Sequence, residues 1–562
     1  MILDLYPRKS YFCTGEAISI EVLLDNIIGD YILKLQVFNL QELIYEEIRP
    51  IVKSDKKVIL EFKLPVKEAN LSGFGVEALL LKGEETISSS STAFDVLEDF
   101  KYAPRYGFLS DFESSELNDE SDAAQLNKYH INAVQFYDWM YRHHELLPPE
   151  DEFIDAMGRR LSLPVVKQKI GYVKSYGMKA IGYGAVYGAE KEYYNEKKEQ
   201  VYFKNDGKVI NFIDFIYMMD INRESPWHDH IIREFSKAID FGFDGIHMDQ
   251  YGFPKEALAR SKEGLKVRHL RDDFPKLIED TRSYIEASGK EVNLIFNAVN
   301  NWPIDSVAKA PQDCMYIEVW SPNDTYEDLN KLIVNAKKYA PDKQVILAAY
   351  LKPFLEKEEE ARKSAENGAL LTMSSIFSSG GFHLLLGENN GVLTEAYYPQ
   401  YARLDSESFI KIMRNYYDFI VRYEELLFNF KLIDNTFTYT GGINGEYTFK
   451  NGNFSPKPES DKVWTQIKEM DGIKVINLIN YTGINNMNWN EGKQQLPEEL
   501  SNIEVTCLVV EKVKEVYFAS PDFDNCMSRK INFKYVEHDQ GKAIQFIVPK
   551  LHIWDIVYIM VG

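Results

Sequence analysis

The chain has 562 residues, which is too long for a single hydrophobic core and predicts two to four domains. Its formal net charge of -22 repels phosphate backbones and anionic lipids, so we expect neither nucleic acid nor a membrane as a partner, whereas a neutral polymer stays possible. The four cysteines are far apart and form no CxxC pair, which argues against a zinc ribbon and against a disulfide framework.

The first 98 residues alternate between apolar and polar positions, as half-buried strands do. Turn residues separate the runs, so residues 1–98 are predicted to form an N-terminal immunoglobulin-like β-sandwich. The apolar positions fall into two sets: Ile18, Ile20, Val22 and Leu24, and then Val58, Leu60, Phe62 and Leu64. The run Ser88–Ser91 is predicted to be an edge strand or a loop.

No signal-peptide pattern follows Met1, and no apolar run is long enough to cross a membrane. As written, the chain is therefore expected to be cytoplasmic. It would be secreted or held at the cell surface if a signal peptide had been removed.

Between residues 99 and 432, short apolar strands alternate with helical stretches, which predicts a parallel sheet built from βα units. Eight strands can be counted, the number that a (β/α)₈ TIM barrel needs. They are "RYGFLSD" from Arg105, "NAVQFYDW" from Asn132, "KAIGYGAVYG" from Lys179, "FDGIHMD" from Phe243, "VNLIFNA" from Val292, "MYIEVW" from Met315, "VILAAYL" from Val345 and "GFHLLLG" from Gly381.

One helix between these strands carries clear start and stop signals. Ser225 is a typical N-cap, Pro226 suits the first helical position, and Gly242 is a typical stop. From residue 433 the period returns to two, so residues 433–562 are predicted to form a C-terminal antiparallel β-sandwich of Greek-key type.

Two acids stand near the ends of predicted strands four and six. Side chains alternate along a strand, so Asp249 shares a side with His247, and Glu318 shares a side with Tyr316 and Trp320. Because function in such barrels sits at the C-terminal strand ends, both carboxylates should face one pocket. A carboxylate pair among aromatic rings is what glycoside cleavage requires. The alternative is that each acid pairs with a nearby lysine or arginine or caps a helix.

Further polar and aromatic residues at the strand ends are candidates for binding sugar hydroxyls and ring faces. They are Asp111, Tyr137, Asp138, Tyr183, His247, Asn297, Trp320, His383 and Glu388. His143 and His144 are a weak metal signal, because adjacent side chains rarely point together and no spaced third ligand follows. There is no GxSxG motif and no phosphate-binding glycine loop, and neither a metal nor a cofactor is predicted.

Taken in order, several of these stretches resemble glycoside hydrolase family 66, the endodextranases and cycloisomaltooligosaccharide glucanotransferases. The resemblance covers roughly residues 100–430, and the flanking β-domains fit the family's architecture. The matching pieces are "RYGFLSDF", "NAVQFYDWMYRHH", "MMDINRESPWHDHI", "GFDGIHMDQYG", "YIEVW" and "SSGGFHLLLGENNGVLTEAYYP". "GFDG" alone is common among α-glycosidase barrels, but the ordered set is fairly specific.

The resemblance implies a retaining mechanism on α-1,6-glucan, with dextran or isomaltooligosaccharides as substrate. Asp249 would be the nucleophile and Glu318 the acid/base. Cyclising members of the family carry a large carbohydrate-binding insert near strand seven, whereas here "AAYLKPFLEKEEE" runs directly into a helix, which favours plain hydrolysis. Two alternatives stay open, namely a transglycosylase that forms cyclic or longer isomaltooligosaccharides and a non-catalytic glucan-binding protein. The oligomeric state is not predicted.

Overall fold

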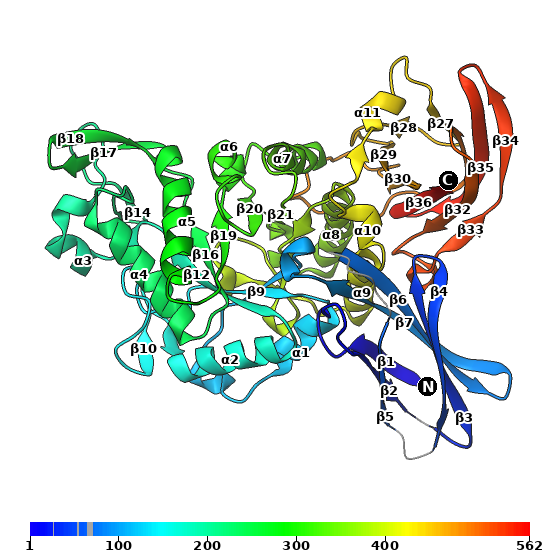
Figure 1. The fold of residues 1–562 in the computed structure, drawn as a ribbon, viewed down its shortest axis with the longest axis horizontal. Helices are drawn as coiled ribbons and strands as arrows, with labels where there is room; N and C mark the ends of the chain where they lie inside the picture. Colours follow the sequence, from blue (N-terminus) through cyan, green and yellow to red (C-terminus); the bar gives the residue numbers. More distant parts are fainter. Residues whose placement is uncertain (26, 53–55, 65–70) are drawn as a thin grey trace.

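The computed structural model describes residues 1–25, 27–52, 56–64 and 71–562. It shows a multidomain, strand-rich chain with a curled central sheet and two flanking β-rich units (Figure 1). Both flanking units lie at one end of the central unit, and the long hairpin β17–β18 lies at the opposite end. Among the described residues no helix is long and apolar enough to cross a membrane.

The N-terminal unit consists of two antiparallel sheets that enclose one apolar cluster. All eight apolar positions expected to face inward are buried. The run Ser88–Ser91 belongs to β7, which is an edge strand as predicted. The sheets are β1 (Ile2–Pro7), β2 (Ile18–Leu24) and β5 (Lys57–Phe62), and β4 (Glu42–Ile51), β3 (Tyr31–Asn39), β6 (Leu71–Lys82) and β7 (Glu85–Leu97).

The central unit contains a strand in each of the eight predicted stretches. Neighbouring strands pair in parallel, and the eighth stretch is split into two short pieces. One piece pairs with the seventh strand and the other with the first, so the sheet curls round on itself. The strands are β8 (Tyr106–Leu109), β9 (Ala133–Phe136), β12 (Lys179–Ala185), β16 (Gly245–Asp249), β19 (Asn293–Asn297), β20 (Cys314–Glu318), β21 (Val345–Ala348), β22 (Phe382–His383) and β23 (Leu386–Gly387).

A helix follows each of these strands on the outside of the curled sheet (Figure 1). In α4, Ser225 Oγ accepts a hydrogen bond from the Trp227 amide, Pro226 starts the helix, and Gly242 ends it with φ 135°, as predicted. The helices are α1 (Ser121–Lys128), α2 (Leu163–Ser175), α4 (Pro226–Phe241), α5 (Leu270–Glu286), α6 (Ile304–Val307), α7 (Tyr326–Tyr339), α8 (Glu359–Ser378) and α9 (Glu407–Arg422).

Smaller elements decorate the loops of the central unit. They are β10 (Glu152–Ile154), β11 (Arg160–Ser162), β13 (Gly188–Ala189), α3 (Lys191–Glu196), β14 (Asn211–Phe212), β15 (Ile216–Met218), β17 (Glu256–Ser261), β18 (Gly264–His269), β24 (Gly391–Val392), β25 (Ala402–Arg403) and α10 (Glu424–Leu427).

The C-terminal unit also has two sheets around an apolar cluster. The first sheet holds β26 (Ile433–Asp434), β29 (Val463–Met470), β30 (Ile473–Asn480), β36 (Trp554–Val561), β32 (Val513–Ala519), β33 (Arg529–Ile531) and β28 (Phe454–Ser455). The second holds β27 (Tyr447–Lys450), β31 (Leu500–Leu508), β35 (Gly541–Leu551) and β34 (Phe533–His538), and α11 (Thr436–Tyr439) precedes it.

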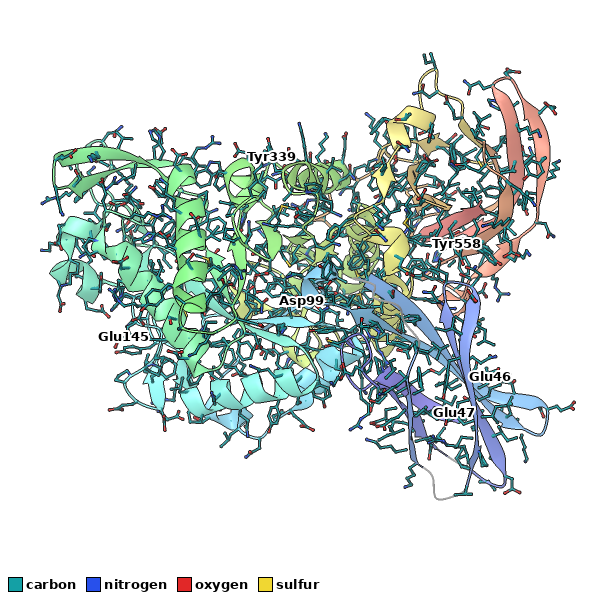
Figure 2. All side chains as sticks on the ribbon, viewed as in Figure 1. Glu46, Glu47, Asp99, Glu145, Tyr339 and Tyr558 are labelled. Atoms are coloured by element: carbon teal, nitrogen blue, oxygen red, sulfur yellow. The ribbon has the colours of Figure 1, made fainter. Side chains whose placement is uncertain are left out.

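The N-terminal unit packs closely on α9 through β6 and β7. A Cβ atom added to Gly73 would lie 2.0 Å from the Val421 carbonyl oxygen, so only glycine allows this approach. Thr92 Oγ1 donates a 2.9 Å hydrogen bond to Asp418 of α9. The two flanking units also touch, because Tyr558 donates to Gln41 over 3.2 Å. Figure 2 labels Tyr558 on the side of the C-terminal unit that faces the N-terminal unit.

Candidate active site

A cavity of about 420 Å³ opens at the carboxyl ends of the central strands. Eight of the residues predicted from the sequence line it, and they come from strands that are far apart in the chain. They are Tyr137, Asp138, Tyr183, His247, Asp249, Asn297, Glu318 and Trp320. Parity along β16 and β20 thus placed both acids correctly, since His247 and Asp249, and Tyr316, Glu318 and Trp320, all face this cavity.

Asp249 and Glu318 are joined through one amide group. Asn297 Nδ2, at the end of β19, donates to Asp249 Oδ1 at 2.8 Å and to Glu318 Oε2 at 3.1 Å. The distance between Asp249 Oδ1 and Glu318 Oε2 therefore cannot exceed the sum of these two hydrogen-bond lengths. That span admits the roughly 5–5.5 Å of a retaining pair.

Each carboxylate also accepts a hydrogen bond from its own tyrosine. Tyr183 Oη donates to Asp249 Oδ2 at 2.8 Å, and Tyr350 Oη donates to Glu318 Oε1 at 2.7 Å. Among the described residues, no lysine or arginine nitrogen forms an ion pair with either acid. Pairing with a cation, the alternative reading of these two acids, therefore does not account for their position.

Burial makes this pair hard to ionise fully. Loss of solvation raises the pKa of Asp249 to about 7, with repulsion from Glu318 as the next cause. Loss of solvation also raises the pKa of Glu318, against the hydrogen bonds from Tyr350 and Asn297. Two interacting acids lose their protons in two steps that belong to the pair. The site can therefore hold one proton across the two carboxyls at moderately acidic to neutral pH.

Asp138 is a third buried acid in the cavity, and its φ of 47° is unusual for a residue other than glycine. Arg159 fixes this backbone by donating to the Asp138 carbonyl oxygen at 2.7 Å. Burial raises the pKa of Asp138 to about 6, although Arg159 and His143 oppose the shift. Asp138 can thus accept or donate a hydrogen bond to a polar ligand.

His143 and His144 do point together, against the expectation for neighbouring residues. Both Nδ1 atoms bond to the Glu190 carboxylate, at 2.6 and 2.7 Å. Glu190 raises the pKa of His143 despite its burial, which favours the protonated form of the imidazole beside Asp138 on the cavity wall. In the described part of the chain there is no group of three histidine, cysteine, aspartate or glutamate side chains that could hold a metal ion.

The floor and mouth of the cavity are aromatic. His247 lies between the rings of Tyr106 and Tyr183, and burial lowers its pKa to about 3, so it is neutral. Trp320 is 39% exposed and meets the ring of Tyr350 edge-on at 5.7 Å. A flat apolar ring that is open to solvent at the mouth suits stacking against a sugar face.

Three predicted binding residues do not reach this cavity. Asp111 and Glu388 line a separate hollow beside it, where the Glu388 carboxylate accepts from the amides of Ser110 and Asp111 at 3.0 and 3.1 Å. His383 is buried, and its Nε2 bonds to the Ala349 carbonyl oxygen at 2.9 Å.

Twelve further lining residues were not among the predicted site residues, and most of them lie in loops or short strands between the eight predicted strands. They are Gln135, His143, Met157, Phe212, Ile213, Ile216, Tyr251, Tyr316, Tyr350, Ala396, Tyr397 and Tyr398. Tyr316 and Tyr350 could have been found, because the same parity that selects Glu318 selects Tyr316, and Tyr350 lies within the seventh predicted stretch.

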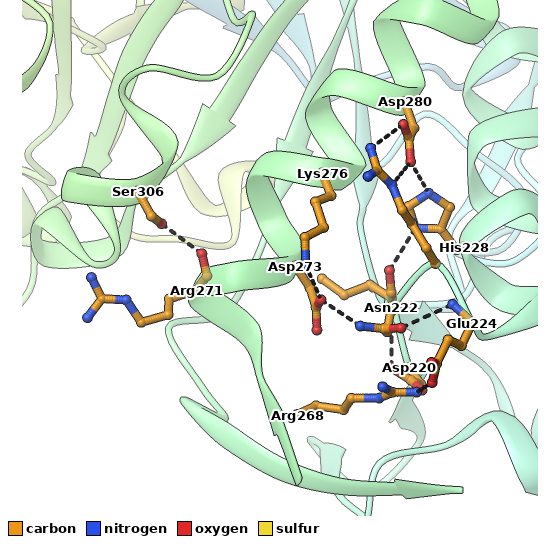
Figure 3. A network of polar contacts seen from close by, with 12 residues as sticks. Asp220, Asn222, Glu224, His228, Arg268, Arg271, Asp273, Lys276, Asp280 and Ser306 are labelled. Carbon is orange, nitrogen blue, oxygen red and sulfur yellow. Dashed lines mark hydrogen bonds and ion pairs between the residues drawn. The ribbon is translucent and has the colours of Figure 1, made fainter. Parts of the chain in front are cut away.

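A polar network surrounds the segment before α4, which follows the β14–β15 turn in the chain (Figure 3). Arg268 of β18 donates to Asp220 and Glu224 at 3.3 and 3.0 Å, and Asn222 donates to Asp273 of α5 at 2.7 Å. These bonds tie the segment before α4 to the β17–β18 hairpin and α5. The β14–β15 turn, which carries Phe212, Ile213 and Ile216, belongs to the same excursion and closes this side of the cavity.

Comparison with known proteins adds to this geometry. A family model described as Glycosyl hydrolase family 66 matches residues 7–558. A cycloisomaltooligosaccharide glucanotransferase from Niallia circulans is 23% identical over 711 aligned residues, which cover 99% of this chain and 71% of that protein. A dextranase from Streptococcus salivarius is 24% identical over 561 residues, covering 85% and 66%. A crystal structure of a Paenibacillus cycloisomaltooligosaccharide glucanotransferase, complexed with cycloisomaltoheptaose, superposes with a TM-score of 0.88 at 20% identity and covers 99% of both chains.

Proposed function

The chain belongs to glycosyl hydrolase family 66, and from that premise we propose that it is a retaining endo-α-1,6-glucanase that hydrolyses dextran or isomaltooligosaccharides. The observation that carries this proposal is the position of Asp249 and Glu318 on the one amide nitrogen of Asn297. The names of its relatives, a dextranase and glucanotransferases of isomaltooligosaccharides, support the choice of linkage.

In the first step, Asp249 attacks the anomeric carbon and forms a covalent ester. The bond from that carbon to the glycosidic oxygen breaks, and Glu318 gives its proton to the departing oxygen. The raised pKa of the buried pair supplies that proton in the free enzyme. Tyr183 donates a hydrogen bond to Asp249, and Tyr350 donates one to Glu318, so each acid has its own donor. This difference in surroundings allows the two acids to take different roles.

In the second step, water replaces Asp249 on the anomeric carbon. Esterified Asp249 no longer carries a charge, so it no longer repels a charge on Glu318, whose pKa falls. Glu318 then takes a proton from the incoming water, and the ester bond breaks. Two inversions give net retention of the α-configuration.

The curled central sheet is the (β/α)₈ barrel of this proposal. Residues 1–98 would form an immunoglobulin-like sandwich, residues 99–432 the catalytic barrel and residues 433–562 the C-terminal sandwich. The parallel pairing of β23 with β8 supports closure of the barrel, and the separate apolar clusters of the flanking units support their division from it.

Hydrolysis, as opposed to transglycosylation, is favoured by the short connection after β21. Only residues 349–358, which include η5 (Lys352–Leu355), connect β21 to α8, so no additional domain is inserted here. The alignment with the glucanotransferase needs 711 positions for a chain of 562 residues, so that relative carries segments which this chain lacks. Without additional sugar-binding segments near the cavity, water competes more easily as the acceptor.

The test is incubation with a panel of α-glucans that differ only in linkage. We expect reducing sugar from α-1,6-glucan, a fall in viscosity ahead of reducing-sugar release, and linear oligosaccharides on chromatography. Protein carrying Asp249→Asn, purified identically, controls for contaminating activity. Cyclic products would favour the transglycosylase, and binding of dextran without any cleavage would favour a non-catalytic glucan-binding protein.

A further inference from the structure

The tyrosines of the cavity differ in how their hydroxyl groups are used. Tyr183 and Tyr350 donate to the two acids, and the hydroxyls of Tyr316 and Tyr398 bond to each other at 3.1 Å. The hydroxyl of Tyr251 is buried and has no hydrogen-bond partner in the described part of the chain. Of the residues that line the cavity, Tyr251 alone carries a buried unpartnered side-chain atom.

The ring of Tyr251 is held firmly in this position. Phe212 stacks on it with a centroid distance of 4.5 Å and an interplanar angle of 23°. The Tyr251 amide donates to Tyr187 Oη at 2.7 Å, and the Gly252 amide donates to Gln250 Oε1 at 2.7 Å. These contacts hold the ring in place, with its hydroxyl near that of Tyr183.

A buried hydroxyl without a partner destabilises the folded chain, and phenylalanine would fill the same space without that cost. Packing against Phe212 explains the ring but not the oxygen. Burial and the nearby charge of Asp249 raise the pKa of Tyr251 well above its usual value, so the hydroxyl keeps its proton and stays a donor. A fixed donor in a cavity wall, left unpaired, suits a ligand that arrives later.

We propose that Tyr251 Oη is a substrate-contact donor for the 2-hydroxyl of the glucosyl unit that Asp249 attacks. This inference rests on the proposed function. Tyr251 lines the same cavity as Asp249, so its hydroxyl is placed to meet atoms next to the anomeric carbon, which are the ring oxygen and the 2-hydroxyl. The ring oxygen gains positive charge in an oxocarbenium-like transition state and would be destabilised by a donor, whereas a hydrogen bond to the 2-hydroxyl strengthens there.

The test compares two substrates that need no protonated leaving group, α-isomaltosyl fluoride and its analogue lacking the 2-hydroxyl on the reacting unit. With the parent fluoride, Tyr251→Phe is expected to lower kcat/KM roughly 10- to 100-fold, as for a lost hydrogen bond in a water-excluded site. With the 2-deoxy analogue, wild type and Tyr251→Phe are expected to differ by less than about twofold, because the partner is already gone.

Tyr417→Phe is the matched control, because the Tyr417 hydroxyl is also buried without a partner but does not line the cavity. Both variants should melt no lower than wild type, and Tyr417→Phe should keep the kcat/KM of wild type. Equal losses with Tyr251→Phe on both fluorides, no loss on either, or a lowered melting temperature would overturn the inference. A wild-type protein inactive on both the fluoride and dextran would overturn the proposed function and this inference with it. If wild type cleaves dextran but Tyr251→Phe keeps the wild-type kcat/KM on both fluorides, only the inference is overturned.

Discussion

Asp249 and Glu318 each accept a hydrogen bond from the same amide group, that of Asn297. Neither acid has a cationic partner among the described residues, and burial raises the pKa of both. A change at one acid therefore alters the charge state of the other, so their contributions to activity cannot be separated by single substitutions alone.

Asp249→Asn should abolish the covalent step while the cavity keeps its shape. We expect kcat on dextran to fall by several orders of magnitude and the affinity for isomaltooligosaccharides, measured by calorimetry, to stay within about tenfold. A variant that keeps more than a few per cent of the wild-type rate would contradict the role of Asp249 as nucleophile.

The pH dependence of kcat/KM should be bell-shaped, because the reactive form holds one proton on the pair. Since burial and repulsion raise the pKa of Asp249 to about 7, activity should fall as pH rises through neutrality and the last proton leaves the pair. The mechanism assigns this last proton, and with it the alkaline limb, to Glu318. It assigns the acidic limb to Asp249. In Glu318→Gln the alkaline limb should vanish.

External azide should restore turnover of an activated substrate by Glu318→Gln and give an α-configured glycosyl azide. Nuclear magnetic resonance distinguishes the anomers. A β-azide, or an alkaline limb that survives in Glu318→Gln, would assign the acid/base role to another residue. Glu388, which holds the amides of Ser110 and Asp111, is an unsuitable replacement because it faces a different hollow.

Asn297→Ala should move the whole pH profile to higher pH. The Asn297 amide lowers the pKa of both acids by bonding to their charged forms, so its removal raises both pKa values. We also expect kcat/KM to fall roughly 10- to 100-fold. Asn293→Ala is the matched control. Asn293 begins β19, at the opposite end of the strand from Asn297, and donates to the Asp244 carbonyl oxygen. A profile that stays in place would refute the shared bond.

Trp320→Ala should raise KM on dextran about tenfold with little change in kcat, because a ring at the mouth stacks on a sugar distant from the broken bond. The control is Tyr284→Ala, which removes a ring of similar exposure on α5 that does not line the cavity. Equal effects of the two substitutions would show that Trp320 contributes no specific stacking.

Gly73→Ala should destabilise the chain without touching the cavity, because a Cβ there would collide with the Val421 carbonyl. We expect a loss of about 1–3 kcal/mol in the free energy of unfolding and an unchanged kcat for the folded protein. Gly445→Ala adds the same methyl group where no atom lies within 4 Å, and it should be neutral. Denaturant unfolding measures both.

Strand periodicity predicted the two acids and the lining residues nearest to them, because side-chain parity is a local property of the sequence. His247 and Asp249 on β16, and Glu318 on β20, followed from it directly. Parity could not predict His383, because the eighth stretch breaks between β22 and β23, and the ring turns to the Ala349 carbonyl instead of the cavity.

Long-range contacts account for the remaining differences. Glu388 follows the eighth stretch as expected. Its carboxylate accepts hydrogen bonds from the backbone amides after β8, and these segments meet because the sheet curls. The wall residues Phe212 and Tyr251 lie in excursions between the eight strands, and their rings stack on each other at 4.5 Å. No spacing rule applies to such loops, so the sequence alone left them out.

The docking of β6 and β7 on α9 has a consequence for synthesis of the chain. During translation, Thr92 leaves the ribosome more than three hundred residues before its partner Asp418, a delay on the order of tens of seconds at roughly 5–20 residues per second. The waiting surface combines polar groups such as Thr92 and Asp95 with apolar side chains such as Leu97. A nascent N-terminal unit therefore exposes both kinds of group to water until α9, the helix that covers them, has emerged.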